Sequence, residues 1–89
     1  MKNRKIKFSR PFEKAFSKLS GEIRKAAYEK LDIFLKDPSH PSLRVKKIKG
    51  TDTLWEMSIT MNYRITFQVG EEEIFLRHIG THDILRRSW

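Results

Sequence analysis

Apolar side chains recur every three or four positions in two stretches of the first half of the chain. The first stretch contains Phe12, Phe16 and Leu19, and the second runs from Ile23 to Leu35. A repeat near 3.6 residues predicts amphipathic helices whose apolar stripes face a core. Because positions 20–21 form a short joint, the two helices are expected to make an αα-hairpin.

The ends of both helices carry residues that favour a start or a stop. Ser9 is a candidate N-cap, and Pro11 follows in a first turn where its missing N–H costs nothing. Pro38 disfavours helical geometry in Asp37, so the second helix is expected to stop there. Before the first helix, Ile6-Lys7-Phe8 is a strand candidate, and 38–42 is a turn-rich connector.

Alternation of apolar and polar residues replaces the helical spacing after position 42 and predicts strands. The expected strands cover 43–49, which Gly50-Thr51-Asp52 ends, then 55–60, 64–69 and 74–79. We therefore predict an α+β fold, in which the helical hairpin packs on a twisted, mainly antiparallel sheet of four to five strands. A chain of 89 residues is expected to form one domain, 1–89, around one core.

The side chains also predict the register of the hairpin between 55 and 69. A three-residue loop at 61–63 brings the apolar residues together and pairs Ile59 with Ile65 and Met57 with Phe67. The other face then carries only polar side chains, which are Glu56, Ser58, Thr60, Arg64, Thr66 and Gln68.

A four-residue turn at 70–73 predicts the register of the last strand. It sets three pairs, Val69 with Ile74, Phe67 with Leu76, and Ile65 with His78. This register makes His78 a buried structural histidine and puts Arg77 on the polar face beside Thr66. His82 follows the strand end that returns to Arg64, so Arg64, Arg77 and His82 are expected to converge on one patch.

Composition adds a strong positive charge to this picture. Lys and Arg number 19 against 11 Asp and Glu, for a net charge of +8, and the excess gathers near the N-terminus, at 44–49 and near the C-terminus. Clustered cations favour a polyanion, because binding releases counterions from a phosphate backbone. We expect a nucleic acid, RNA in particular, with an acidic protein as the alternative. The expected RNA-binding residues are Lys46, Lys47, Lys49, Arg77, Arg86 and Trp89.

The same composition argues against several classes of protein. The chain has no cysteine and three scattered histidines, so we expect no disulfide, no metal and no other cofactor. No apolar run approaches the roughly 20 residues of a membrane span, and 1–5 leads into a strand instead of a signal-peptide core. We expect a cytoplasmic protein without membrane contact.

Arg64 and His82 fit the chemistry of a ribonuclease that uses no metal. Such an enzyme needs a group that takes the 2′-hydroxyl proton, an acid for the departing 5′-oxygen, and cations for the charged phosphorus. Histidine serves either proton transfer near neutral pH, and arginine offers a fixed fork of donors to phosphate. The alternative for His82 is a place beside a helix cap, with Thr81 or Asp83 beginning a last turn.

Four segments that follow the two expected helices resemble the RelE/ParE superfamily of bacterial type II toxin-antitoxin toxins, over essentially the whole chain. They are KKIKG at 46–50, LWEM at 54–57, YRITF at 63–67 and IGTHD at 79–83. The resemblance implies a compact RelE-like, microbial-RNase-like fold. For RelE-type members it also implies cleavage of messenger RNA, usually in the ribosomal A site, and a cognate antitoxin, normally encoded beside the toxin, that wraps it.

The resemblance also implies roles for individual residues. Arg64 matches the arginine that stabilises phosphate, and the Gly-Thr-His segment is similar to YafQ-type toxins, which assigns His82 to proton transfer. Two lysines of RelE fall at Glu56 and Ser58, so cations are lost there and Glu56 becomes a candidate base. The C-terminal catalytic tyrosine of RelE has no counterpart, and Trp89 at most stacks on a base.

Three functions follow from this reasoning. The leading hypothesis is an endoribonuclease that acts on ribosome-bound mRNA and inhibits translation. A ParE-like inhibitor of DNA gyrase is the rival, although ParE-type members generally lack the constellation of Arg64 and His82. The third is a catalytically inactive homologue that only binds its antitoxin.

Overall fold

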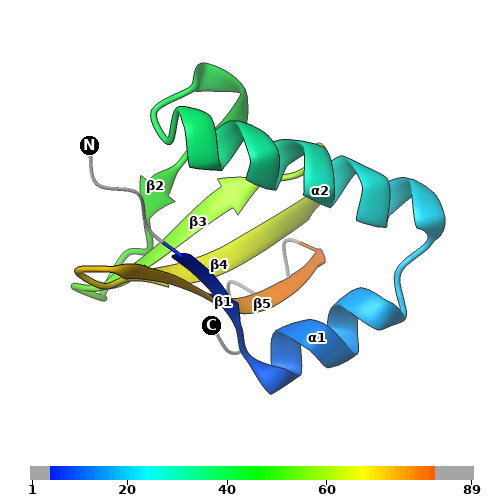
Figure 1. The fold of residues 1–89 in the computed structure, drawn as a ribbon, viewed down its shortest axis with the longest axis horizontal. Helices are drawn as coiled ribbons and strands as arrows, with labels where there is room; N and C mark the ends of the chain where they lie inside the picture. Colours follow the sequence, from blue (N-terminus) through cyan, green and yellow to red (C-terminus); the bar gives the residue numbers. More distant parts are fainter. Residues whose placement is uncertain (1–4, 82–89) are drawn as a thin grey trace.

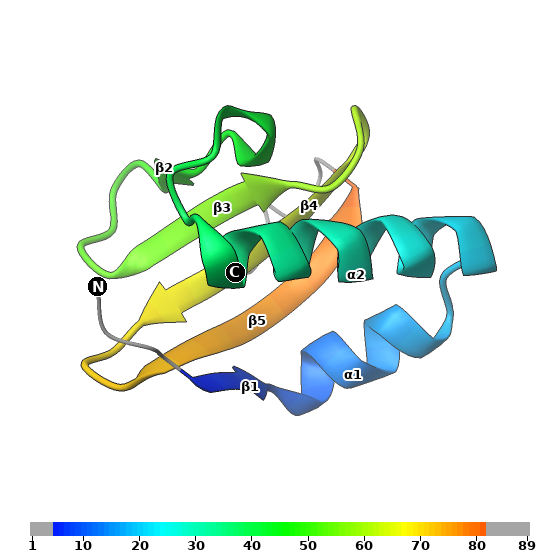
Figure 2. The same cartoon turned by 45° about the horizontal axis from the view of Figure 1, so that its top comes forward.

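The computed structural model describes residues 5–81 of the 89-residue chain. Both helices cover one face of a twisted sheet, so the fold is α+β as predicted (Figures 1 and 2). The elements, in chain order, are β1 (Lys5–Phe8), α1 (Arg10–Ser17), α2 (Gly21–Lys36), the 3-10 helix η1 (Pro41–Leu43), β2 (Lys46–Lys47), β3 (Leu54–Ser58), β4 (Tyr63–Val69) and β5 (Glu73–Thr81).

The strands of the described residues lie in the order β1-β5-β4-β3-β2. Neighbouring strands are antiparallel, apart from β1, which runs parallel to β5. A parallel pair needs a long crossover connection, and both helices follow β1 in the chain and precede the antiparallel strands (Figure 1). The central strand of the sheet is therefore β4, and β5, β4 and β3 each have a neighbour on both sides.

Serine hydroxyls begin both helices, as the sequence predicts for the first. The Ser9 hydroxyl accepts a hydrogen bond from the Phe12 N–H at 3.1 Å and donates one to the Arg77 carbonyl at 2.6 Å. The Ser20 hydroxyl accepts from the Ile23 N–H at 3.3 Å at the start of α2. Ser9 thus caps α1 and joins its first turn to β5.

A single apolar cluster fills the space between the helices and the sheet. The rings of Phe34 on α2 and Phe67 on β4 meet edge to face at 5.2 Å. The fully buried members with the largest side chains are Phe12, Phe67, Leu43, Met57, Ile65 and Leu76. Because these apolar side chains all face the helices, the polar side chains of β3 and β4 face the other way.

The register of β3 and β4 differs by two residues from the predicted one. Met57 pairs with Ile65, and Trp55 pairs with Phe67, so the predicted pairs of Ile59 with Ile65 and Met57 with Phe67 are wrong. The Thr60 hydroxyl accepts the N–H groups of the next residues, including Tyr63 at 3.2 Å, and this closes the turn earlier. A shift of two positions preserves the alternation, so the predicted facing of every side chain in the hairpin holds.

A β-bulge changes the register halfway along β4 and β5. The predicted pairs of Val69 with Ile74 and Phe67 with Leu76 are confirmed, but the ladder shifts between Thr66 and Phe67. Ile65 then pairs with Ile79, and His78 pairs with Thr66, so the predicted core position of His78 is wrong. The extra residue is needed because Leu76 and Ile79, three positions apart, are both buried in the core.

The segment 43–49 was predicted to be one strand, and this prediction is wrong for most of its residues. Pro41 begins the 3-10 turn η1, which puts Leu43 in the core at 0% exposure, and strand pairing is limited to Lys46–Lys47. Arg44 ends η1 in the left-handed region, at φ 48° and ψ 46°. Gly50, at φ 86°, ends the segment as predicted, in a conformation that favours glycine.

Candidate active site on the polar face of the sheet

The face of the sheet that points away from the helices carries a row of four polar residues, one from each of four adjacent strands. Strand pairing places Lys46 of β2 opposite Glu56 of β3, Glu56 opposite Thr66 of β4, and Thr66 opposite His78 of β5. Adjacent strands lie about 4.8 Å apart, so about 10 Å separate the backbones at Glu56 and His78. We call this face, with its row and with Ser58, Arg64 and Gln68, the polar face.

Glu56 and Arg64, two of the residues predicted to be catalytic, form an ion pair on this face. Arg64 Nε lies 3.9 Å from Glu56 Oε1, and the two side chains are 16% and 8% exposed. Little water screens charges at such exposure, so removing one partner leaves the other charge buried and unpaired. The pair fixes a carboxylate beside a guanidinium at the centre of the sheet.

The turn between β3 and β4 fixes the orientation of the Arg64 guanidinium. Its Nη1 donates hydrogen bonds to the carbonyls of Thr60 at 2.8 Å, Met61 at 3.0 Å and Tyr63 at 3.0 Å. Among residues 5–81, no hydrogen bond engages its Nη2. Arg64 is therefore held rigidly, with one amino group left to bind an anion.

Thr66 lies between Glu56 and His78 in the row and has an unsatisfied hydroxyl. The residue is 0% exposed, and its Oγ1 has no hydrogen-bond partner among residues 5–81. A buried hydroxyl without a partner costs about 1–3 kcal/mol, so it calls for an explanation in a native structure. An unsatisfied buried hydroxyl that lowers stability is typical of a functional site.

His78 is the residue that sequence reasoning missed on this face. Its pKa is lowered from the ordinary value of 6.5, first by burial and then by the positive charge of Arg77 beside it. A neutral imidazole at neutral pH is able to accept a proton. A partial signal is the spacing of Ile74, Leu76 and Ile79 by two and then by three, because a strand that buries all three needs a bulge.

The other predicted site residues lie in different places. Lys46 ends the row at the sheet edge, while Lys47 pairs with Trp55 and faces the opposite side. Lys49 is exposed beyond β2, and Arg77 is half-buried at the bulge. Thr66 therefore lies opposite His78, and the predicted place of Arg77 beside Thr66 is wrong. Three of the predicted residues lie outside the described residues, namely His82, Arg86 and Trp89. The last described residue, Thr81, ends β5 and pairs with Tyr63, the neighbour of Arg64.

Neither a metal site nor a membrane-spanning helix occurs in the described part of the chain. Within residues 5–81, no group of three or more His, Cys, Asp or Glu side chains is arranged to hold a metal ion. Among the described helices, none has the length and apolar character that crossing a membrane requires.

Several solved structures resemble this chain over most of its length. A chain of the archaeal RelE-RelB complex from Pyrococcus horikoshii OT3 matches with a TM-score of 0.73 and 20% identity, over 90% of this chain and 96% of that one. The RelB-RelE antitoxin-toxin complex from Methanococcus jannaschii gives 0.72 and 25%, over 89% and 93%. The E. coli DinJ-YafQ toxin-antitoxin complex gives 0.77 and 10%, over 93% and 97%. No protein-family model and no curated protein sequence matches.

Proposed function

We propose that this chain, which has the fold of the RelE/ParE superfamily of toxins, is the toxin of a type II toxin-antitoxin system and cleaves mRNA. In this proposal it is a metal-independent endoribonuclease that acts in the cytoplasm on ribosome-bound mRNA and inhibits translation. The proposal rests on the buried pair of Glu56 and Arg64, in which Glu56 belongs to the same row of the polar face as His78.

The proposed reaction is attack of a ribose 2′-hydroxyl on the adjacent phosphorus. The new P–O2′ bond forms as the P–O5′ bond breaks, which leaves a 2′,3′-cyclic phosphate and a 5′-hydroxyl. Glu56 takes the 2′-hydroxyl proton, and His82 gives a proton to the departing 5′-oxygen. Arg64 Nη2 faces the negative charge that develops on the phosphate oxygens.

His78 competes with Glu56 for the role of base, because its lowered pKa keeps it neutral at neutral pH. The pH dependence of cleavage tests His78. If His78 is the base, activity is lost as pH falls through its lowered pKa, which lies below the ordinary histidine value of 6.5.

The test is to induce the chain briefly in a bacterial host and to map the 5′ ends of cellular transcripts. We expect new ends within coding regions and growth arrest for the wild type, and neither effect for Arg64→Gln. His82→Ala tests the acid, and Lys14→Gln, an exposed change on α1, serves as the control. Equal cleavage by wild type and His82→Ala would remove His82 from the mechanism.

An inactive homologue that only binds its antitoxin is the second candidate. One observation favours it, since three carbonyls and Glu56 hold Arg64 as they would hold a purely structural arginine. This candidate predicts intact transcripts and normal growth. DNA damage with intact transcripts would instead indicate gyrase inhibition.

The proposed protein partner is an antitoxin encoded in the adjacent gene. Support comes from similar structures that were solved as toxin-antitoxin complexes. A net charge of +8 also favours an acidic partner. Co-expression with the adjacent gene is expected to restore growth and to give a complex that co-purifies.

A further inference from the structure

A cleft lies where α2 and η1 approach the turn between β3 and β4. Its volume is about 290 Å³. We call it the hairpin cleft, and its polar lining consists of Lys30, Ser42, Arg44, Ser58, Thr60 and Arg64. Arg64 therefore borders both the polar face and this cleft.

The lining of the hairpin cleft suits a phosphate group. Lys30, Arg44 and Arg64 bring three positive charges to one small space, and three hydroxyl side chains lie among them. None of the described residues that line the cleft is acidic. Glu56 already pairs with Arg64, so Lys30 and Arg44 are the two cations whose mutual repulsion a bound anion relieves.

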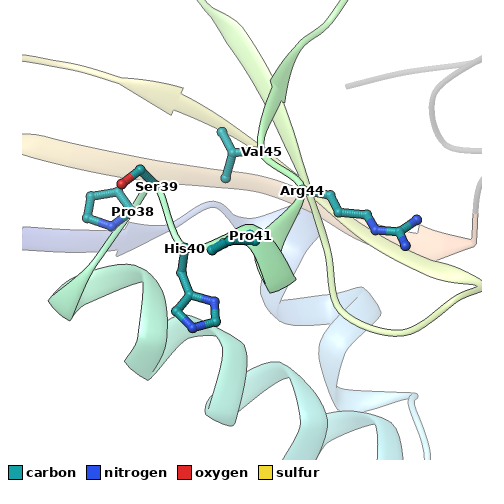
Figure 3. A pocket seen from close by; sticks show the side chains of 6 residues that line it. All are labelled: Pro38, Ser39, His40, Pro41, Arg44 and Val45. Atoms are coloured by element: carbon teal, nitrogen blue, oxygen red, sulfur yellow. The ribbon is translucent and has the colours of Figure 1, made fainter.

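The backbone at Arg44 is unusual and helps to place this residue. Its φ of 48° lies in the left-handed region, which costs a residue other than glycine about 1–2 kcal/mol. Arg44 also borders a neighbouring hollow formed by 38–45, but its guanidinium extends away from Pro38, His40 and Pro41 (Figure 3). Within residues 5–81, its side chain makes no ion pair and no hydrogen bond.

Lys30 is held at the opposite side of the cleft. Its Nζ donates to the Ser42 carbonyl at 3.4 Å, which ties the middle of α2 to η1. This long bond uses one of three ammonium donors and leaves the others to bind an anion. Lys30 of α2 and Arg44 at the end of η1, both distant from β4 in the sequence, thus supply cations next to Arg64.

We propose that the hairpin cleft is a phosphate subsite, in which Lys30 and Arg44 bind a backbone phosphate of RNA adjacent to the phosphate that faces Arg64. The inference rests on the proposed function, since it takes RNA as the substrate class. The subsite adds a second binding point, on the helix side of the turn between β3 and β4. Two binding points fix the direction in which the RNA strand runs past Arg64.

The test measures how the affinity for RNA depends on salt. The ligand is a single-stranded oligonucleotide with 2′-O-methyl groups throughout, which cannot be cleaved because the attacking hydroxyl is blocked. Each phosphate contact contributes about 0.7 to the slope of log affinity against log salt for a single strand. The double variant Lys30→Gln with Arg44→Asn is expected to lower the slope by about 0.7, because one phosphate contact is lost.

Both substitutions preserve local structure. Glutamine keeps a donor for the Ser42 carbonyl, and asparagine tolerates the left-handed backbone of Arg44. The matched control is Lys14→Gln with Lys25→Gln, which removes the same charge from exposed positions on α1 and α2. Its slope is expected to stay near that of the wild type. Arg44→Lys keeps the charge and is expected to retain the slope of the wild type.

Several outcomes decide the proposal. Equal slopes for wild type and double variant with both ligands overturn it, as does an equal fall in the control. A repeat with ribosomes as the ligand shows whether the bound phosphate belongs to the oligonucleotide or to ribosomal RNA, and a fall in either arm supports the subsite. Because the oligonucleotide resists cleavage, an inactive protein that shows the fall refutes the proposed function and not the subsite.

Discussion

The two faces of the central sheet differ in how well their buried side chains are satisfied. On the helix side, Met57, Ile65 and Leu76 are 0% exposed in a continuous apolar cluster. On the polar face, Glu56 is 6% and Thr66 0% exposed, but here the buried groups are a charge and a hydroxyl that no other residue of 5–81 bonds. One face is built for stability, whereas the other accepts a cost in stability at the place where chemistry is proposed.

The largest expected effect comes from the helix side. Phe67→Ala removes a ring that is 1% exposed and packs edge to face on Phe34. We expect the free energy of unfolding to fall by about 3–5 kcal/mol, from lost burial and the cavity that remains. Urea denaturation measures this loss, with Gln68→Ala on the polar face as the control. A loss below about 1 kcal/mol would contradict the assignment of this core.

The second effect breaks the charge pair of the polar face. Glu56→Ala leaves Arg64 without its carboxylate, and we expect a loss of about 3 kcal/mol in the free energy of unfolding. Adding Arg64→Met is expected to recover part of this loss, because no unpaired charge then remains. A double-mutant cycle by urea denaturation measures the coupling. Strictly additive losses would show that the two side chains do not interact.

The third substitution is expected to raise the free energy of unfolding, in contrast to the first two. Thr66→Val replaces a hydroxyl that has no partner in the described part of the chain, so we expect the free energy of unfolding to rise by about 1 kcal/mol. Thr60→Val is the contrast, because its hydroxyl accepts two backbone N–H groups in the turn, and it is expected to destabilise. Thermal unfolding compares the two variants. Destabilisation by Thr66→Val would mean that its hydroxyl is satisfied in solution.

The smallest effect is the pH dependence that His78 contributes. Its folded pKa lies below the ordinary value of 6.5, so the unfolded chain binds the proton more readily. Stability is therefore lost as pH falls through the window from 6.5 down to the folded pKa, and it is unaffected above that window. His78→Gln is expected to remove this loss, with His40→Gln at an exposed position as the control. Denaturation at several pH values measures it, and identical profiles for wild type and His78→Gln would refute it.

The parts of the fold that depend on local sequence were predictable. The cap at Ser9 and the stop before Pro38 are local events, and the alternation in β3 and β4 determines which side chains share a face. That alternation alone is sufficient to bring Glu56 and Arg64 to the same face of the sheet.

What remained unpredictable depends on hydrogen bonds and packing between distant residues. The two-residue register shift follows from the bonds of the Thr60 hydroxyl, and the bulge follows from the burial of Ile79. Predicting the bulge would have moved His78 onto the polar face. The segment at 43–49 alternates like a strand, but burial of Leu43 and the turn at Pro41 prevail.

The central claim, that the polar face cleaves RNA, is tested most directly with purified protein and a labelled mRNA on programmed ribosomes. We compare the initial cleavage rate of the wild type with that of Arg64→Gln, after circular dichroism shows that both are folded. The account predicts that the rate falls by about 10²- to 10³-fold in the variant. An equal rate in the two proteins, or no cleavage by the wild type, would contradict it.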